Sequence, residues 1–391
     1  MRERSVTSSR IAIGWLSALS LALVSCGGGS SGGSTPTPSP TPSPTPTPSA
    51  ATFTLPAAQS LSIADVEKVV AQSVAEAQAR NVGAAIAAAD RAGNVLAIFR
   101  MNSAAPTAII RSAPSGNNHD AQGVTIPATA AAIAKAVTGA YLSSGGNAFS
   151  TRPASMIVQQ HFPPAVVATG LESGPLYGVQ FSQLPCSDLS SRYINGNVGA
   201  GALIGPKRSP LGLSADPGGF PLYKNGVLVG GIGVMIDGDY GFDADIVNVD
   251  SDVEELTALA GTRGFEAPEA IRADKIPVDG TTLRYSDASY AQLTSNAAPS
   301  FATINGSIGN LIAVRGYFGS PTPAIVAGSV YGSEASGLRL ATSGEFARTD
   351  AMVLSDGSGA NRYPARAGTD GSLVSTPIST TEARILLEDA F

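Results

Sequence analysis

The stretch VGAAIAAADRAGNVLAIFR at residues 82–100 decides the fold of this chain. It contains two apolar runs of strand length, residues 84–89 and 95–101, which are joined by the polar segment DRAGN. Gly93 in that segment adopts positive φ at little cost, as a tight reversal of the chain requires. The pattern therefore predicts a β-hairpin over residues 84–101.

A second hairpin is predicted far downstream. Residues 220–223 and 227–236 are apolar, and they flank Lys224-Asn225-Gly226. Asn-Gly between two apolar runs is the strongest short-range hairpin signal. We expect the two hairpins to share one β-sheet.

Helices are predicted around these hairpins. Two begin with a capping box, SIAD at residues 62–65 and SDVE at residues 251–254, in which the first and fourth side chains satisfy free backbone amides. An Ala-rich helix is predicted over residues 127–142, with Pro127 at its start, and another helix over residues 152–161. This order of helices and hairpins implies an antiparallel sheet with packed helices, and therefore an α+β fold.

Composition narrows the classes of function. Of the 391 residues 43% are apolar, which is enough to bury a core. Lys and Arg number 24 against 30 Asp and Glu, giving a net charge of -6 without any basic block, so we expect no nucleic acid partner. Two His and two Cys are too few for a His-rich metal cage or a disulfide framework. The sequence also lacks the common hydrolase, nucleotide-binding and zinc-protease motifs.

The N-terminus has the pattern of a lipoprotein signal peptide. Arg2, Arg4 and Arg10 precede an apolar run over residues 11–24, which is shorter than the roughly 20 residues that cross a bilayer as a helix. The run closes in LVSC, which resembles the lipobox of bacterial lipoproteins. That resemblance implies cleavage before Cys26 and lipidation of this residue, including palmitate, so we expect a membrane-anchored protein of the cell envelope, on its periplasmic or outer-membrane face.

The chain is expected to divide into five parts. They are a signal peptide over residues 1–25, a Gly/Ser and Thr-Pro/Ser-Pro linker over 26–50, an α+β domain over 51–290, a Gly-, Ser- and Ala-rich region without assigned structure over 291–375, and the start of a truncated second repeat over 376–391. Ser379 and Glu382 suggest the repeat, because they show the same capping-box pattern as Ser62 and Asp65. A capped turn also arises by chance, and both interpretations stay open.

Three segments together resemble the GlcG/HbpS haem-binding family. They are residues 82–100, the segment AKAVT at 134–138, and the Gly-rich hairpin over 219–234, in matching order and spacing. The resemblance covers about residues 62–264. It implies a profilin-like fold that often forms homo-oligomers, with haem or another small molecule bound in a pocket or at a subunit interface.

Few residues suit haem. Its iron needs an axial donor and its propionates need cations, which makes His161, Arg100 and Lys135 the candidates. Each has a structural alternative: His161 as a hydrogen-bonded buried side chain, Arg100 in a salt bridge at the hairpin end, and Lys135 as a charge on a helix surface. The other histidine, His119, lies in a polar loop and is expected to be solvated.

An acidic loop offers a candidate calcium site. Asp237, Asp239, Asp243 and Asp245 place four carboxylates within nine residues, as a calcium ion requires. The spacing does not fit an EF-hand, because Phe242 takes the place of the required glycine. A solvated loop is the alternative interpretation.

Three functions follow from these observations. The preferred one is a lipid-anchored envelope protein that binds haem or a related small carboxylated ligand for capture, storage or sensing. The second is a tethered enzyme acting on a small metabolite, with Arg100 and Lys135 fixing the substrate and Asp90 or Asp188 moving a proton. The third is a calcium-binding structural surface protein.

Overall fold

The chain divides into two units, Met1–Thr54 and Leu55–Phe391, and the residues that can be described belong to the second. The computed structural model describes residues 56–112, 116–118, 121–159, 207, 209, 211–245, 248–313, 323–346, 351–355, 357–368 and 377–390.

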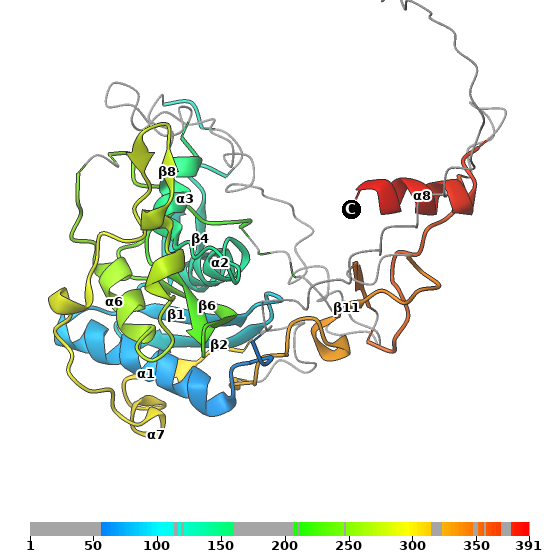
Figure 1. Ribbon diagram of the computed structural model, residues 1–391. Coiled ribbons are helices and arrows are strands. Elements are labelled where there is room, and N and C mark those ends of the chain that lie inside the picture. The colour runs from blue at the N-terminus through cyan, green and yellow to red at the C-terminus, as the bar shows by residue number, and fades with distance from the viewer. Residues whose placement is uncertain are drawn as a thin grey trace, which may run out of the picture. The chain divides into compact units, whose positions relative to one another are not determined.

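One antiparallel sheet forms the centre of the fold (Figure 1). Its strands, in spatial order, are β10 (Gly309–Leu311), β2 (Val95–Met101), β1 (Ala85–Asp90), β6 (Val227–Met235) and β5 (Gly219–Lys224). The ladder between β1 and β6 pairs Ala85 with Met235 and Asp90 with Gly230. The two hairpins predicted from the sequence therefore share one sheet, and the α+β prediction is confirmed.

The remaining elements surround this sheet or follow it in the chain. The helices are α1 (Ile63–Ala79), α2 (Ala128–Tyr141), α3 (Thr151–Ile157), α6 (Val253–Gly261), α7 (Phe301–Ile304) and α8 (Thr380–Ala390), with 3-10 turns at Glu269–Ile271, Ala273–Lys275, Tyr290–Gln292 and Glu334–Ser336. The other strands are β3 (Thr107–Ile110), β4 (Thr125–Pro127), β7 (Asp239–Tyr240), β8 (Pro277–Val278), β9 (Thr281–Thr282), β11 (Leu338–Leu340) and β12 (Met352–Leu354). A small sheet has the order β4-β3-β7, and β8–β9 and β11–β12 are isolated pairs.

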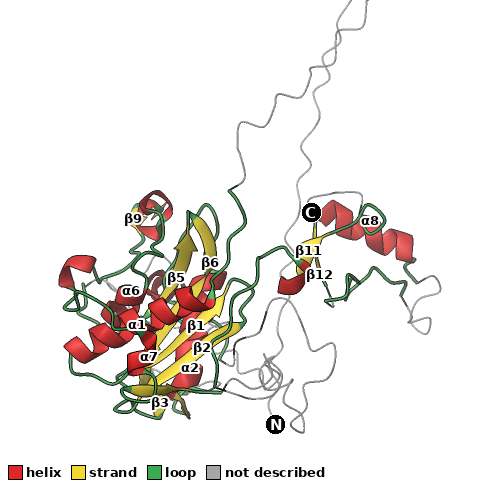
Figure 2. Cartoon of the chain, turned by 90° about the horizontal axis from the view of Figure 1, so that it is seen from below, coloured by secondary structure: helices red, strands yellow, loops and turns green. Residues whose placement is uncertain are grey.

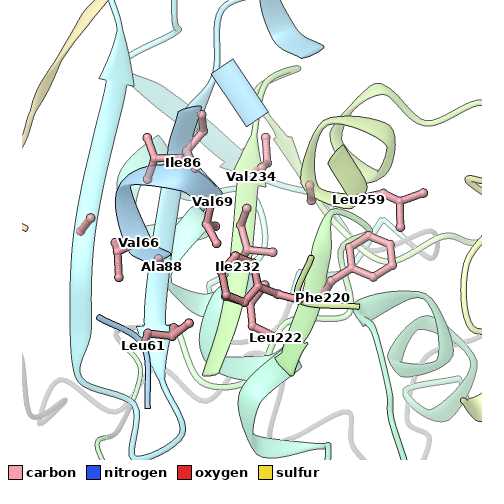
Figure 3. Packing of buried hydrophobic residues seen from close by; sticks show 14 of the residues in the cluster. Leu61, Val66, Val69, Ile86, Ala88, Phe220, Leu222, Ile232, Val234 and Leu259 are labelled. Carbon is pink, nitrogen blue, oxygen red and sulfur yellow. The ribbon is translucent and has the colours of Figure 1, made fainter. Parts of the chain in front are cut away.

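Helices cover both faces of the central sheet, as Figure 2 shows. On β1, Ile86 and Ala88 point into the cluster that contains α1 and α6, whereas Ala85, Ala87 and Ala89 point toward α2. Figure 3 shows Val66 and Val69 of α1 over the first of these faces. Because successive side chains alternate between two buried faces, β1 is a continuous apolar run without polar alternation.

The α2 helix lies directly on the backbone of β6. A Cβ atom added to Gly231 would stand 2.1 Å from the carbonyl oxygen of Ala136, and one on Gly233 would stand 2.2 Å from that of Ala132. No real side chain fits at such distances. The glycines of β6 therefore face the alanines of α2, and the small size of both residue types allows the two backbones to come together.

The capping boxes explain where the helices begin. Asp65 N donates to Ser62 Oγ over 3.2 Å and Ser62 N donates to Asp65 Oδ2 over 2.8 Å, as predicted for α1. The predicted box at Ser251 is wrong by one residue, because Asp252 is the N-cap of α6 and accepts from the amide of Glu255 over 2.8 Å. Glu254 is therefore not needed for capping, and its side chain points into the core, where it pairs with Lys135.

The helix predicted over residues 152–161 is α3, which is shorter. It begins one residue earlier, because Ser150 caps the amide of Arg152 over 3.0 Å, and its last helical residue is Ile157. Gln159 then donates its side-chain amide to the carbonyl of Ser155 over 2.9 Å, which satisfies one carbonyl at the helix end.

The packed body continues past the boundary predicted at residue 290. Glu76 of α1 is fully buried and accepts hydrogen bonds from the backbone and hydroxyl groups of Thr294 and Ser295 at 2.6–3.2 Å. Burial by itself raises the pKa of Glu76, but these hydrogen bonds and Arg80 outweigh burial and lower it to about 2. Further along, β10 pairs with β2, so the region left unassigned by sequence supplies an edge strand.

The C-terminal helix α8 forms with the predicted capping box. Ser379 N donates to Glu382 Oε2 over 2.8 Å, and Glu382 N donates to Ser379 Oγ over 3.2 Å. Its apolar residues Ile385, Leu386 and Leu387 are exposed. That this helix starts a second repeat stays a prediction. Within the described residues, every helix is too short or too polar to cross a membrane.

We expect Gly231→Ala to lower the free energy of unfolding by about 3 kcal/mol, because its methyl group collides with the Ala136 carbonyl. The control is Gly145→Ala, at a position where an added Cβ meets nothing within 4 Å. Urea unfolding followed by circular dichroism measures both variants. Equal stability of the two would show that α2 does not depend on the contact.

Candidate functional site

The predicted ligand cation Lys135 lies in the core. Its side chain is 0% exposed, and its Nζ is 2.7 Å from Asp216 Oδ2 and hydrogen-bonded to Glu254 Oε2. Burial alone would lower the pKa of Lys135, but the two carboxyl groups raise it above its ordinary value. The prediction that Lys135 binds a ligand is therefore wrong, as is its alternative as a surface charge, because two buried acids already enclose its ammonium group.

The two acids resist ionisation, and burial raises the pKa of Glu254 to about 7, against the opposing effect of Lys135. Glu254 Oε1 also accepts from the backbone amides of Ile236 and Asp237, the latter over 3.1 Å, and such donors favour its charged form. Burial raises the pKa of Asp216 well above its ordinary value, against the effect of Lys135. Because Lys135 contacts both acids, the cluster is a structural tie between α2, α6 and the segment before β5.

The four acids of the predicted calcium site are not brought together. Asp239 forms an exposed ion pair of 2.6 Å with Arg111, and Asp243 forms a buried one of 2.8 Å with Arg152. Among the described residues, the carboxylates that lie close enough to share an ion are those of Asp243, Asp250 and Asp287, not the predicted four, so the predicted calcium site is wrong. The chain folds around guanidinium groups here because each arginine supplies a fixed cation for the nearby carboxylate.

Another acidic group forms around Arg152. Carboxylate oxygens of Asp243, Asp250 and Asp287 lie within 4.8 Å of one another. The buried guanidinium of Arg152 already stands among them, at 2.8, 3.3 and 3.6 Å, and it also pairs with Glu255 at 2.9 Å. The guanidinium takes the position of a metal ion, so the group closes the core and does not offer a free cation site.

Arg100 keeps an exposed side chain on β2, beside Asn310 of β10. No carboxylate of the described residues pairs with it, so the predicted salt bridge at the hairpin end is not found within this part of the chain. Asp90, the predicted proton carrier, is buried and accepts from the amides of Ala92 and Asn94 at 3.0 and 2.9 Å. Within the described residues, the β1–β2 hairpin thus exposes the guanidinium of Arg100 and encloses the carboxylate of Asp90. Cys26, His119, His161 and Asp188 lie outside the described residues.

The structure contains a cavity of about 280 Å³ that the sequence did not predict. Its lining residues come from the β1–β2 turn, the end of α2 and the C-terminal segment, and they are Arg91, Ala140, Tyr141, Ser143 and Tyr331. The guanidinium carbon of Arg91 lies 3.9 Å from the centre of the Tyr331 ring. The sequence indicated this site only through the segment DRAGN, which places an arginine in a tight turn. Its partner Tyr331 lies far along the chain, so local patterns could not connect the two residues.

Three solved structures that resemble this chain are the PduOC–heme complex, the protein ORFY from Klebsiella pneumoniae, and HbpS. The sequence identities are 16%, 18% and 18%, and the TM-scores are 0.30, 0.28 and 0.27. The similarity covers 53%, 56% and 54% of this chain and 95%, 100% and 92% of those chains. No family model and no curated protein matches the sequence.

We expect Lys135→Met to lower the free energy of unfolding by about 3–5 kcal/mol, because it leaves two buried acids without a cation. Adding Glu254→Gln to this variant restores part of the loss. The control is Lys275→Met, at an exposed lysine, which changes stability by about 0.5 kcal/mol or less. Urea unfolding measures the stability of all three variants. If Lys135→Met lowered the free energy of unfolding no more than Lys275→Met does, the structural role of Lys135 would be contradicted.

Proposed function

We propose that this protein is a lipid-anchored component of the cell envelope that binds haem or a related small carboxylated ligand, for capture, storage or sensing. Haem enters the proposal through the sequence resemblance to the GlcG/HbpS family, and the anchor enters through the lipobox that ends in Cys26. The Pro-rich linker after Cys26 then serves as a spacer between the lipid and the folded body.

The observation that carries binding over turnover is the state of three charged groups, Lys135 on α2 and Asp90 and Arg100 on the β1–β2 hairpin. The enzymatic alternative uses Arg100 and Lys135 to hold the substrate and Asp90 or Asp188 to move a proton. Of these groups, Lys135 and Asp90 are buried and engaged by the protein's own groups. Arg100 keeps an exposed guanidinium that no carboxylate of the described residues pairs with. A free guanidinium recognises a carboxylate such as a haem propionate through paired hydrogen bonds.

Haem itself needs an axial donor as well as a cation. His161 stays the proposed axial ligand, with its imidazole nitrogen on the iron. Arg100 is proposed to hold a propionate. Lys135, the other cation predicted to bind a carboxylate, has no part in this site because its side chain is buried.

Haemin added to the purified protein without its first 50 residues is expected to produce a shifted Soret band that saturates near one equivalent. Arg100→Glu is expected to weaken haemin binding about tenfold, because it replaces a propionate partner by a like charge. The matched control is Arg384→Glu on α8, which leaves the affinity unchanged. Absence of any Soret shift at stoichiometric haemin would contradict the haem proposal.

The anchor is tested separately in cells. We expect the wild-type protein in the membrane fraction and Cys26→Ser in the soluble fraction, because the variant lacks the thiol that receives the lipid. Cys186→Ser is the control, since it keeps the lipobox and is expected to stay with the membrane. Equal membrane recovery of Cys26→Ser and wild type would rule out lipidation at this residue.

A further inference from the structure

We propose that the cavity between Arg91 and Tyr331 is a binding site for a small aromatic carboxylate. This site goes beyond the proposed haem function, because it does not include Arg100. Arg91 lies in the turn that joins β1 to β2, whereas Arg100 pairs with Ala85 at the opposite end of the hairpin. With about 3.3 Å per strand residue, the two arginines are separated by the length of β2, on the order of 20 Å.

The guanidinium of Arg91 is free to bind an anion. Its side chain is half-buried, and no carboxylate oxygen of the described chain lies within 4.0 Å of it. It lies against the ring of Tyr331 at 3.9 Å, and a guanidinium over a ring face keeps its in-plane N–H donors for another partner. A carboxylate matches this row of donors with two parallel hydrogen bonds.

The two walls that carry Arg91 and Tyr331 are held by one residue. Asp90 Oδ1 accepts from the turn amides of Ala92 and Asn94, which sets the turn that presents Arg91. Asp90 Oδ2 accepts from the amide and hydroxyl of Ser329 at 3.1 and 2.9 Å, two residues before Tyr331. The cation and its aromatic partner are therefore positioned before any ligand arrives, which lowers the entropic cost of binding.

A second aromatic wall is also fixed. The Tyr141 hydroxyl accepts from the amide of Lys207 over 2.6 Å and lies 2.7 Å from its carbonyl oxygen and 3.0 Å from that of Ala92. Gly93 leaves room for it, since an added Cβ would stand 2.3 Å from the hydroxyl oxygen. Tyr141 thus lines the cavity as a rigid ring whose polar end is already satisfied.

Size and lining together select the ligand. At about 30 Å³ per water, a cavity of about 280 Å³ has the volume of roughly nine waters, which admits a single ring with one carboxylate. Two tyrosine rings favour an aromatic ring in offset or edge contact. Inorganic phosphate would leave these apolar walls unused, and a cation would be repelled by Arg91.

Benzoate is the probe, and isothermal titration calorimetry of the purified protein is the measurement. We expect benzoate to bind with a dissociation constant of about 0.1–1 mM, and Arg91→Gln to weaken it tenfold or more. Tyr331→Ala is expected to weaken benzoate about fivefold through loss of the stacked ring. Arg100→Gln is the matched control and leaves benzoate binding unchanged. Benzamide, which has the ring without the charge, is expected not to bind.

Several outcomes would overturn this site. They are no benzoate binding up to about 10 mM, equal binding by wild type and an Arg91→Gln variant with unchanged urea midpoint, and phosphate binding as tightly as benzoate, which would make this a general anion site. Arg91→Lys keeps the charge without the planar donor row, and its expected affinity is intermediate. A Soret shift with haemin but no benzoate binding would overturn this inference and leave the proposed haem function standing.

Discussion

The contact between the backbones of α2 and β6 is the constraint on which the rest of the structure depends. Gly231 and Gly233 bring the strand so close to Ala132 and Ala136 that no side chain separates the two elements. A helix this near to a sheet buries its whole inner face, including any polar residue on it. The α2 helix is consequently apolar and small along nearly its whole length, and its one charged residue, Lys135, becomes a core residue.

The burial of Lys135 explains much of the polar chemistry of the fold. A buried ammonium needs carboxylate partners, and Glu254 of α6 and Asp216 before β5 supply them. Because Asp252 caps α6, Glu254 is turned inward at the start of that helix. The charged groups that first suggested catalysis are thus used to join elements that lie far apart in the sequence.

Two further buried acids join the C-terminal segment to the same body. Glu76 binds Thr294 and Ser295, and Asp90 binds Ser329, so each acid holds a segment more than 200 residues away in the chain. Asp90 does this while shaping the β1–β2 turn. This double role creates the Arg91–Tyr331 cavity, since it fixes both of the walls that meet there. One wall of the cavity, Tyr331, comes from the part of the chain that follows residues 62–264, the segment that resembles the GlcG/HbpS family.

Local patterns were sufficient for the two hairpins, the capped start of α1 and the α+β class, because turn chemistry, capping and strand periodicity depend on residues a few positions apart. The same patterns failed for Lys135 and for the acidic loop, whose partners include Asp216 and Arg152 from distant parts of the chain. They also could not show Arg91 opposite Tyr331. Spacing along a chain says which residue types are present but not which of them meet across a sheet. Whether a charge binds a ligand or supports the core was therefore settled by three-dimensional packing, since burial and pairing are properties of distant residues brought together.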